Sequence, residues 1–146
     1  MSELVAAEVP AASTVADKQP FTSWKLDLLT AINLDPAVRD VDMRFVVYLI
    51  QGLNQTTRAF NCSDETITDE LNCKRDKLTT SRKRLEGAGW LIVRRGRGFA
   101  DGSWYSFDDQ KVERILSDRD DRRAIRKDER ADRRNERTRQ ALRCAE

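Results

Sequence analysis

Apolar residues at helical spacing mark the first element of the chain. Trp24, Leu28 and Ile32 follow one another at steps of four residues, which is the spacing of one face of a helix. Ser23 stands just before them as a candidate N-cap, and turn-forming residues follow. The pattern therefore predicts a helix over about 22–33.

A second and stronger apolar stripe follows the first. Its members have the i, i+3, i+4, i+7 spacing of a buried helix face, and they are Val46, Leu49, Ile50 and Leu53. Asp40 or Asp42 is the candidate N-cap of this helix. We expect the helix to form the centre of the core. Residues 52–61 are rich in turn formers and polar side chains, which predicts a loop.

Two short helical patterns then flank a tight turn. Ser63 is a candidate N-cap, and the acidic residues that follow it suit the positive end of a helix dipole. Asn72 can adopt the left-handed backbone that the turn requires. The second pattern runs from about Lys74 to Gly87, where the glycine is the predicted C-terminal cap.

The second helix of this pair has two distinct faces. With Leu78 as the reference and about 100° per residue, the inner face is predicted to contain Lys74, Ser81 and Leu85. The predicted outward positions are Asp76, Lys77, Thr79, Thr80, Lys83 and Arg84. Arg75 and Arg82 fall on the flanks, and the pattern leaves the orientation of Arg82 open. An outward face of cations and hydroxyls suits phosphate contact and hydrogen bonding to base edges.

A hairpin is predicted directly after this helix. Residues 90–95 are bulky or β-branched, residues 96–102 supply glycine for a turn, and aromatic residues restore strand character from 104 onward. The aromatic residues in question are Phe99, Trp104, Tyr105 and Phe107. We expect them to pack in the core, although stacking on single-stranded nucleic acid is an alternative. Trp24 and Trp90 are also assigned to the core.

The two ends of the chain differ from its middle. Residues 1–20 show no sustained periodicity, which predicts a disordered leader before a domain at 21–108. Residues 109–146 form a charged tail, in which 117–140 hold ten basic and seven acidic residues but only three apolar ones. This composition is compatible with a helix that has one basic and one acidic face, and equally with a disordered tail.

Charge is segregated along the chain. The 146 residues have a net charge of +2, yet residues 72–98 alone sum to +7 and residues 1–71 to −6. A chain of this size forms one core with appendages. The concentration of positive charge in the middle third indicates a polyanionic partner.

The sequence offers little for catalysis or metal binding. There is no histidine, and the three cysteines lack CxxC spacing, so we expect no zinc site and no enzyme. The glycines do not form a phosphate-binding loop, so we expect no nucleotide cofactor. No stretch approaches the roughly 18 apolar residues of a bilayer span, and no signal peptide is evident. We therefore expect a soluble, cytoplasmic protein without membrane contact.

Residues 22–107 together resemble the winged helix-turn-helix domain of bacterial and phage DNA-binding regulators and replication proteins. The resemblance rests on the helix SDETITDEL, the turn NC, the helix KRDKLTTSRKRLEGAG and the strand WLIVRR. It implies a mainly α fold with a small β-hairpin wing, a second helix in the major groove, and a wing on the adjacent backbone or minor groove. Two positions depart from the family pattern: Asn72, which is often glycine, and Arg82, which is often apolar.

The resemblance also implies which residues meet double-stranded DNA. Those expected to read or approach bases are Lys77, Thr79, Thr80 and Lys83. Those expected to hold phosphates are Lys74, Arg75 and Arg84, with Arg94, Arg95 and Arg97 on the wing. The expected function is that of a sequence-specific, nucleoid-associated transcription regulator of a bacterium or mobile element.

Two other functions are compatible with the same resemblance. One is a plasmid or phage replication initiator that uses the same domain at an origin. The other is a protein-interaction module or antagonist acting through the charged tail, which could equally mediate a homodimer. Fold alone does not choose among them.

Overall fold

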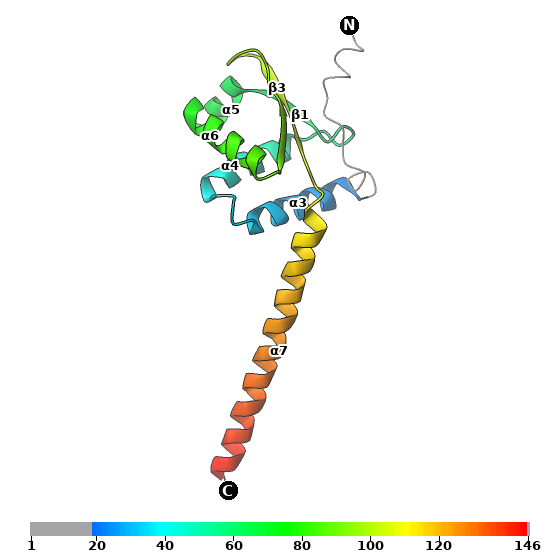
Figure 1. The fold of residues 1–146 in the computed structure, drawn as a ribbon, viewed down its shortest axis with the longest axis vertical. Helices are drawn as coiled ribbons and strands as arrows, with labels where there is room; N and C mark the ends of the chain where they lie inside the picture. The colour runs from blue at the N-terminus through cyan, green and yellow to red at the C-terminus, as the bar shows by residue number, and fades with distance from the viewer. Residues whose placement is uncertain (1–18, 146) are drawn as a thin grey trace. The chain divides into compact units, whose positions relative to one another are not determined.

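The computed structural model describes residues 19–145, so most of the predicted leader, residues 1–18, lies outside it. The described part contains five helices and three strands (Figure 1). In chain order these are α3 (Phe21–Leu34), α4 (Asp40–Gly52), β1 (Phe60–Ser63), α5 (Asp64–Leu71), α6 (Arg75–Gly87), β2 (Leu91–Arg94), β3 (Gly102–Phe107) and α7 (Val112–Ala145). The chain divides into two compact units after Val112. The first unit has the predicted winged helix-turn-helix architecture.

Helices α3 and α4 supply one side of the core, as their apolar stripes predicted. Their caps differ from the prediction. Pro20 is the N-cap of α3, so Ser23 lies inside the helix and does not cap it. Arg39 is the N-cap of α4, so neither predicted aspartate occupies that position. Instead Asp42 reaches back from the third helical position and accepts the Arg39 backbone N–H at 3.0 Å.

The α5–α6 pair is joined by the turn that the sequence predicted. Ser63 caps α5, because its hydroxyl accepts the Thr66 backbone N–H at 3.1 Å. Asn72 has φ 50° and ψ 55°, which confirms the left-handed conformation expected of it. The Cys73 N–H then returns to the Thr68 carbonyl at 3.0 Å, which satisfies a terminal carbonyl of α5.

Helix α6 ends at Gly87, but its cap lies beyond this glycine. Ala88 is the C-cap, and Gly89 adopts the left-handed conformation with φ 83°, so the assignment of the cap to Gly87 was wrong. The Gly89 N–H bonds to the Glu86 carbonyl and the Trp90 N–H to the Leu85 carbonyl. These two bonds form a Schellman motif, which turns the chain from the helix into the wing.

The sheet has one more strand than the sequence predicted. Its order is β1-β3-β2 with both pairings antiparallel, and β1 pairs Phe60 with Tyr105 and Ser63 with Gly102. Residues 60–63 were predicted as the end of a loop and the start of a helix, because a four-residue edge strand has too little pattern to detect. A Cβ at Gly102 would lie 2.0 Å from Asn61 Oδ1, so a larger residue at 102 would have to displace the exposed Asn61 side chain.

Most of the aromatic residues assigned to the core are buried there. Trp24, Trp90, Tyr105 and Phe107 all expose less than a twentieth of their surface. Phe99 is an exception, because it lies in the β2–β3 loop with 41% of its surface exposed. The assignment of Phe99 to the core was therefore wrong.

The charged tail is helical. Helix α7 runs without interruption from Val112 to Ala145 (Figure 1). None of its described residues is buried. The choice that the sequence left open between helix and disorder is thus settled in favour of a helix.

Candidate nucleic-acid interface

The inner face of α6 holds the helix against the domain. Leu78, Ser81 and Leu85 are buried, as the angular pattern predicted. Lys74 is not on this face, because it is the exposed N-cap residue that precedes the helix. Its predicted inward position was wrong, since the helix begins one residue later than expected.

Arg82 completes the inner face of α6. Its side chain is only 6% exposed, and Nη1 lies 2.8 Å from Asp64 Oδ1 and donates to Tyr105 Oη at 2.9 Å. Burial by itself lowers the pKa of Arg82, but the hydrogen bonds to Asp64 and Tyr105 outweigh it and raise that pKa. Burial raises the pKa of Tyr105. The guanidinium is therefore charged and the phenol protonated at neutral pH.

This cluster joins three elements of the domain. Asp64 is the first residue of α5, Arg82 is on α6 and Tyr105 is on β3. A charge-assisted bond between buried groups is directional, so it fixes the angle at which the two helices meet. Arg82 is thus unavailable to DNA, which resolves the orientation that the sequence left open.

The outward face of α6 presents two lysines and a hydroxyl to solvent. Lys77, Thr80 and Lys83 are exposed, and neither lysine forms an ion pair with any residue in the described part of the chain. The Thr80 hydroxyl donates to the Asp76 carbonyl at 2.9 Å. Half-buried Thr79 makes the same kind of bond to Arg75 at 3.0 Å. Both hydroxyl oxygens retain lone pairs that can accept from a base amino group.

Arg75 and the tip of the wing meet at the start of α6. The Arg75 guanidinium lies 5.2 Å from the centroid of the Phe99 ring, and its Nε lies 3.3 Å from Asp64 Oδ2. The Phe99 carbonyl accepts the Glu65 backbone N–H at 3.0 Å. The β2–β3 loop is therefore held against the first turn of α5. The Arg75 side chain is still 53% exposed, which leaves its outer nitrogens accessible to a phosphate.

Arg84 occupies a different environment from the one expected. Its Nη1 lies 2.6 Å from Oδ1 of Asp42, whose side chain is fully buried, and the Arg84 side chain is 25% exposed. Asp42 also caps the start of α4, so the pair ties α6 to α4. A guanidinium that neutralises a buried carboxylate is costly to divert to a phosphate. Arg84 remains a predicted phosphate contact, but its observed partner is Asp42.

Replacing Arg84 with alanine should lower the free energy of unfolding by about 1 to 3 kcal/mol, because Asp42 would be left buried without its cation. The neighbouring Lys83→Ala is the matched control. The exposed Lys83 side chain forms no ion pair with the residues that the structure describes, so its loss should change stability by less than about 0.5 kcal/mol. Urea denaturation of both variants measures the difference. Equal stability of the two variants would show that the pair with Asp42 has no structural role.

The wing carries the remaining predicted cations. Arg94 ends β2 and is exposed, and Arg97 is exposed in the β2–β3 loop. Arg95 Nη2 lies 3.0 Å from Glu86 Oε1, with both side chains open to solvent. An exposed pair of this kind contributes little and exchanges readily for a phosphate.

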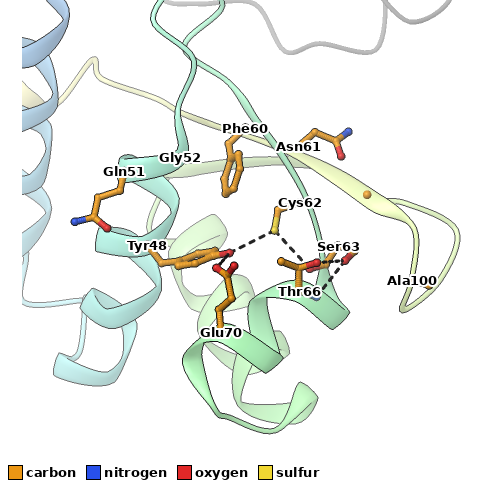
Figure 2. A pocket seen from close by; sticks show the side chains of 11 residues that line it. Tyr48, Gln51, Gly52, Phe60, Asn61, Cys62, Ser63, Thr66, Glu70 and Ala100 are labelled. Atoms are coloured by element: carbon orange, nitrogen blue, oxygen red, sulfur yellow. Dashed lines mark hydrogen bonds between the residues drawn. The ribbon is translucent and has the colours of Figure 1, made fainter.

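A groove of about 590 Å³ lies between α4, β1 and α5 (Figure 2). Tyr48 donates a hydrogen bond to Glu70, and its hydroxyl lies 3.7 Å from the Cys62 thiol. Burial, with the bonds to Glu70 and Cys62, raises the pKa of Tyr48, and burial also raises the pKa of Cys62. Both groups stay protonated at neutral pH, so the groove provides no activated nucleophile.

Sequence reasoning missed the residues that support the interface. Asp64 was expected only to favour the helix dipole, and Asp42 only to cap a helix. Their arginine partners are 18 and 42 residues away in the chain, and no local spacing connects them. The one available signal was the position of Arg82, which lies about 40° from Leu78 and so falls on the inner face, not on the flank to which it was assigned. A charge at such a position needs a buried partner, but the angle does not identify that partner.

Comparisons with known proteins add little to this geometry. No protein-family model and no curated protein sequence matches the chain. Among solved structures, the chain is similar to one described as "N-Terminal domain of DNA binding protein", with 23% identity and a TM-score of 0.37 over 61% of this chain and 76% of that one. Similarity at this level transfers no function. Within residues 19–145, no helix is long and apolar enough to cross a membrane.

Proposed function

We propose that the protein binds double-stranded DNA sequence-specifically and acts as a transcription regulator, with α6 in the major groove and the wing on an adjacent part of the duplex. The observation that carries the proposal is the outward face of α6. It holds exposed lysines that form no ion pair with any described residue, and a Thr80 hydroxyl oxygen that can still accept a hydrogen bond. A buried ion pair fixes this helix from its inner side. The mechanism is occupancy of a site, without catalysis.

The cations of the basic segment divide into two groups. Arg82 and Arg84 neutralise buried aspartates and stabilise the fold. Lys74, Lys77, Lys83 and Arg97 are exposed and form no ion pair within the described residues. A surface cation without an internal partner can bind a phosphate favourably, because no existing ion pair has to be broken. Lys74 and Arg97 of the second group, together with exposed Arg75 and Arg95, are the proposed phosphate-binding set.

Base readout is assigned to Thr80 and Lys83 at the centre of the outward face. They lie about 140° to 200° from Leu78 around the helix, opposite the buried side. A helix placed in the major groove brings such positions to base edges, while its flanks meet phosphates. Lys77 and Thr79 are assigned to the edges of the same face.

Replacing Lys83 or Thr80 with alanine should reduce the preference for the best DNA site over random duplex by roughly 5- to 100-fold, since a lost base contact costs about 1 to 3 kcal/mol. Arg95→Ala on the wing should instead weaken binding to all duplexes and flatten the salt dependence. Fluorescence anisotropy at several salt concentrations measures both, on a site obtained by selection from genomic fragments.

Lys25→Ala serves as the control, because Lys25 lies on α3, where it contacts the Phe21 ring. It should leave both the preference and the salt dependence unchanged. Equal loss on specific and random DNA for every α6 variant would contradict the readout assignment. The selected site also separates the two related functions, since promoters indicate a regulator and an origin indicates a replication initiator.

A further inference from the structure

Helix α7 carries a stripe of positive charge that the proposed contacts of α6 and the wing do not use. We propose that this stripe binds the phosphate backbone of double-stranded DNA, as a second and sequence-independent contact surface. The identity of the polyanion rests on the proposed function. The charge geometry of α7 stands independently of it.

The stripe is continuous along the middle of the helix. Stepping about 100° per residue from Arg122 places nine cations within an arc of about 140° and along about 27 Å of helix. This basic stripe consists of Arg119, Arg122, Arg123, Arg126, Lys127, Arg130, Arg133, Arg134 and Arg137. No acidic residue of the helix falls inside the arc. Six of the acidic residues lie together on the opposite-signed arc from about −20° to −120°.

This separation of basic and acidic residues onto different faces destabilises the helix itself. Between 118 and 137, eight of the ten charged pairs four residues apart have like charge, and each like-charged pair destabilises a helix. The pairs are 119/123, 122/126, 123/127, 126/130, 128/132, 130/134, 132/136 and 133/137. A helix stabilised by its own ion pairs would alternate the signs at this spacing. An external polyanion that neutralises the stripe would remove this repulsion and stabilise the helix.

The side chains of the stripe have few partners of their own. The described residues of α7 form only two ion pairs, Arg119 with Asp120 and Arg139 with Glu136. The arginines frame two hollows of about 500 and 430 Å³, lined by cations alone. The first is lined by Arg130, Arg133, Arg134 and Arg137, and the second by Arg123, Arg126, Lys127, Arg130 and Arg134. Neighbouring guanidinium groups of this kind match phosphate oxygens in charge and in hydrogen-bonding geometry.

Pairing with a second copy of the chain fits α7 less well. The exposed large apolar residues in its charged part are Ile125 and Leu142, which lie about 100° apart around the helix and 17 residues apart in sequence. A coiled coil needs apolar positions sustained over several heptads. The surface therefore offers charge without an apolar seam, which is the pattern of a phosphate-binding face.

The test compares two triple variants of the full chain that remove the same charge from the same helix. One replaces Arg126, Arg130 and Arg134 on the stripe with glutamine, and the other replaces Arg114, Arg139 and Arg143, which lie off the stripe. Binding to a random-sequence duplex of about 30 base pairs is measured by anisotropy across salt concentrations. The stripe variant should lose about tenfold or more in affinity near 0.1 M salt, and its log–log salt slope should fall by about 2 to 3.

The off-stripe variant should bind within about twofold of the unmodified protein. Glutamine and arginine have similar helix propensity, so far-UV circular dichroism should show the helix retained in both variants. If the two triple variants weakened DNA binding equally, the loss would be explained by net charge alone, and the proposal would be overturned. The proposal would also be overturned if the unmodified protein formed a dimer at low salt and the stripe variant did not, while the salt slope of DNA binding stayed the same. The stripe would then bind a second copy of the chain.

The result separates this inference from the proposed function. If Lys83→Ala alters binding while the stripe variant matches its control, the α6 assignment stands and the stripe proposal fails. If the stripe variant weakens binding while the α6 variants have no effect, the reverse holds. Absence of binding to any duplex at low salt would refute both.

Discussion

Replacing Asp64 with alanine should lower the free energy of unfolding by about 3 to 5 kcal/mol, because Arg82 would remain buried without its counter-charge. Arg82 and Asp64 side chains are each only 6% exposed and lie 2.8 Å apart, so solvent cannot replace the missing carboxylate. Chemical denaturation with a far-UV signal measures the loss. Since this ion pair sets the angle between α5 and α6, the variant should also lose the proposed preference for a specific DNA site.

Two controls make this prediction specific. Glu65→Ala removes an exposed acidic residue from the same first turn of α5, so it shares the helix-dipole effect and should cost less than about 1 kcal/mol. The double variant Asp64→Ala/Arg82→Met removes both charges and should be more stable than Asp64→Ala alone, because no unpaired ion remains buried. A double variant as unstable as the sum of the two single changes would show that the residues act independently.

Replacing Trp90 with alanine should cost about 3 to 5 kcal/mol, the range typical of removing a large aromatic residue from a core. Trp90 is completely buried, and its Nε1 donates to Asp35 at 2.7 Å while Lys111 Nζ lies 4.4 Å from the ring centroid. It also follows the Gly89 turn directly. The tryptophan thus holds the first wing strand to the end of α6, and its loss should loosen the wing as well as the core.

Trp90→Phe and Trp104→Ala are the comparisons for this change. Phenylalanine keeps most of the buried surface and should restore much of the stability. Trp104 is only half-buried on β3, so its replacement should cost less than that of Trp90. Urea denaturation of the three variants ranks their free energies of unfolding. A loss below about 1 kcal/mol for Trp90→Ala would show that the wing and helices pack without this anchor.

Local patterns predicted the helices and the turn between α5 and α6. The apolar stripe of α4, the cap at Ser63 and the left-handed Asn72 all depend on residues a few positions apart, and short-range patterns report such relations well. The same reasoning failed at Ser23 and Gly87, where another residue one to three positions away made the cap. It also missed β1, whose pairing partner lies about 40 residues later in β3.

The candidate interface was predictable only in part, for the same reason. The sequence alone determined that residues 72–98 concentrate positive charge, and that Leu78, Ser81 and Leu85 share one side of a helix, because composition and helical period are properties of the chain itself. Only the tertiary structure decided which cations are free. Arg82 and Arg84 are paired with Asp64 and Asp42 because folding places distant residues side by side and makes an unpaired buried charge costly. What remains exposed, chiefly Lys77 and Lys83 on α6, is the surface proposed to bind DNA.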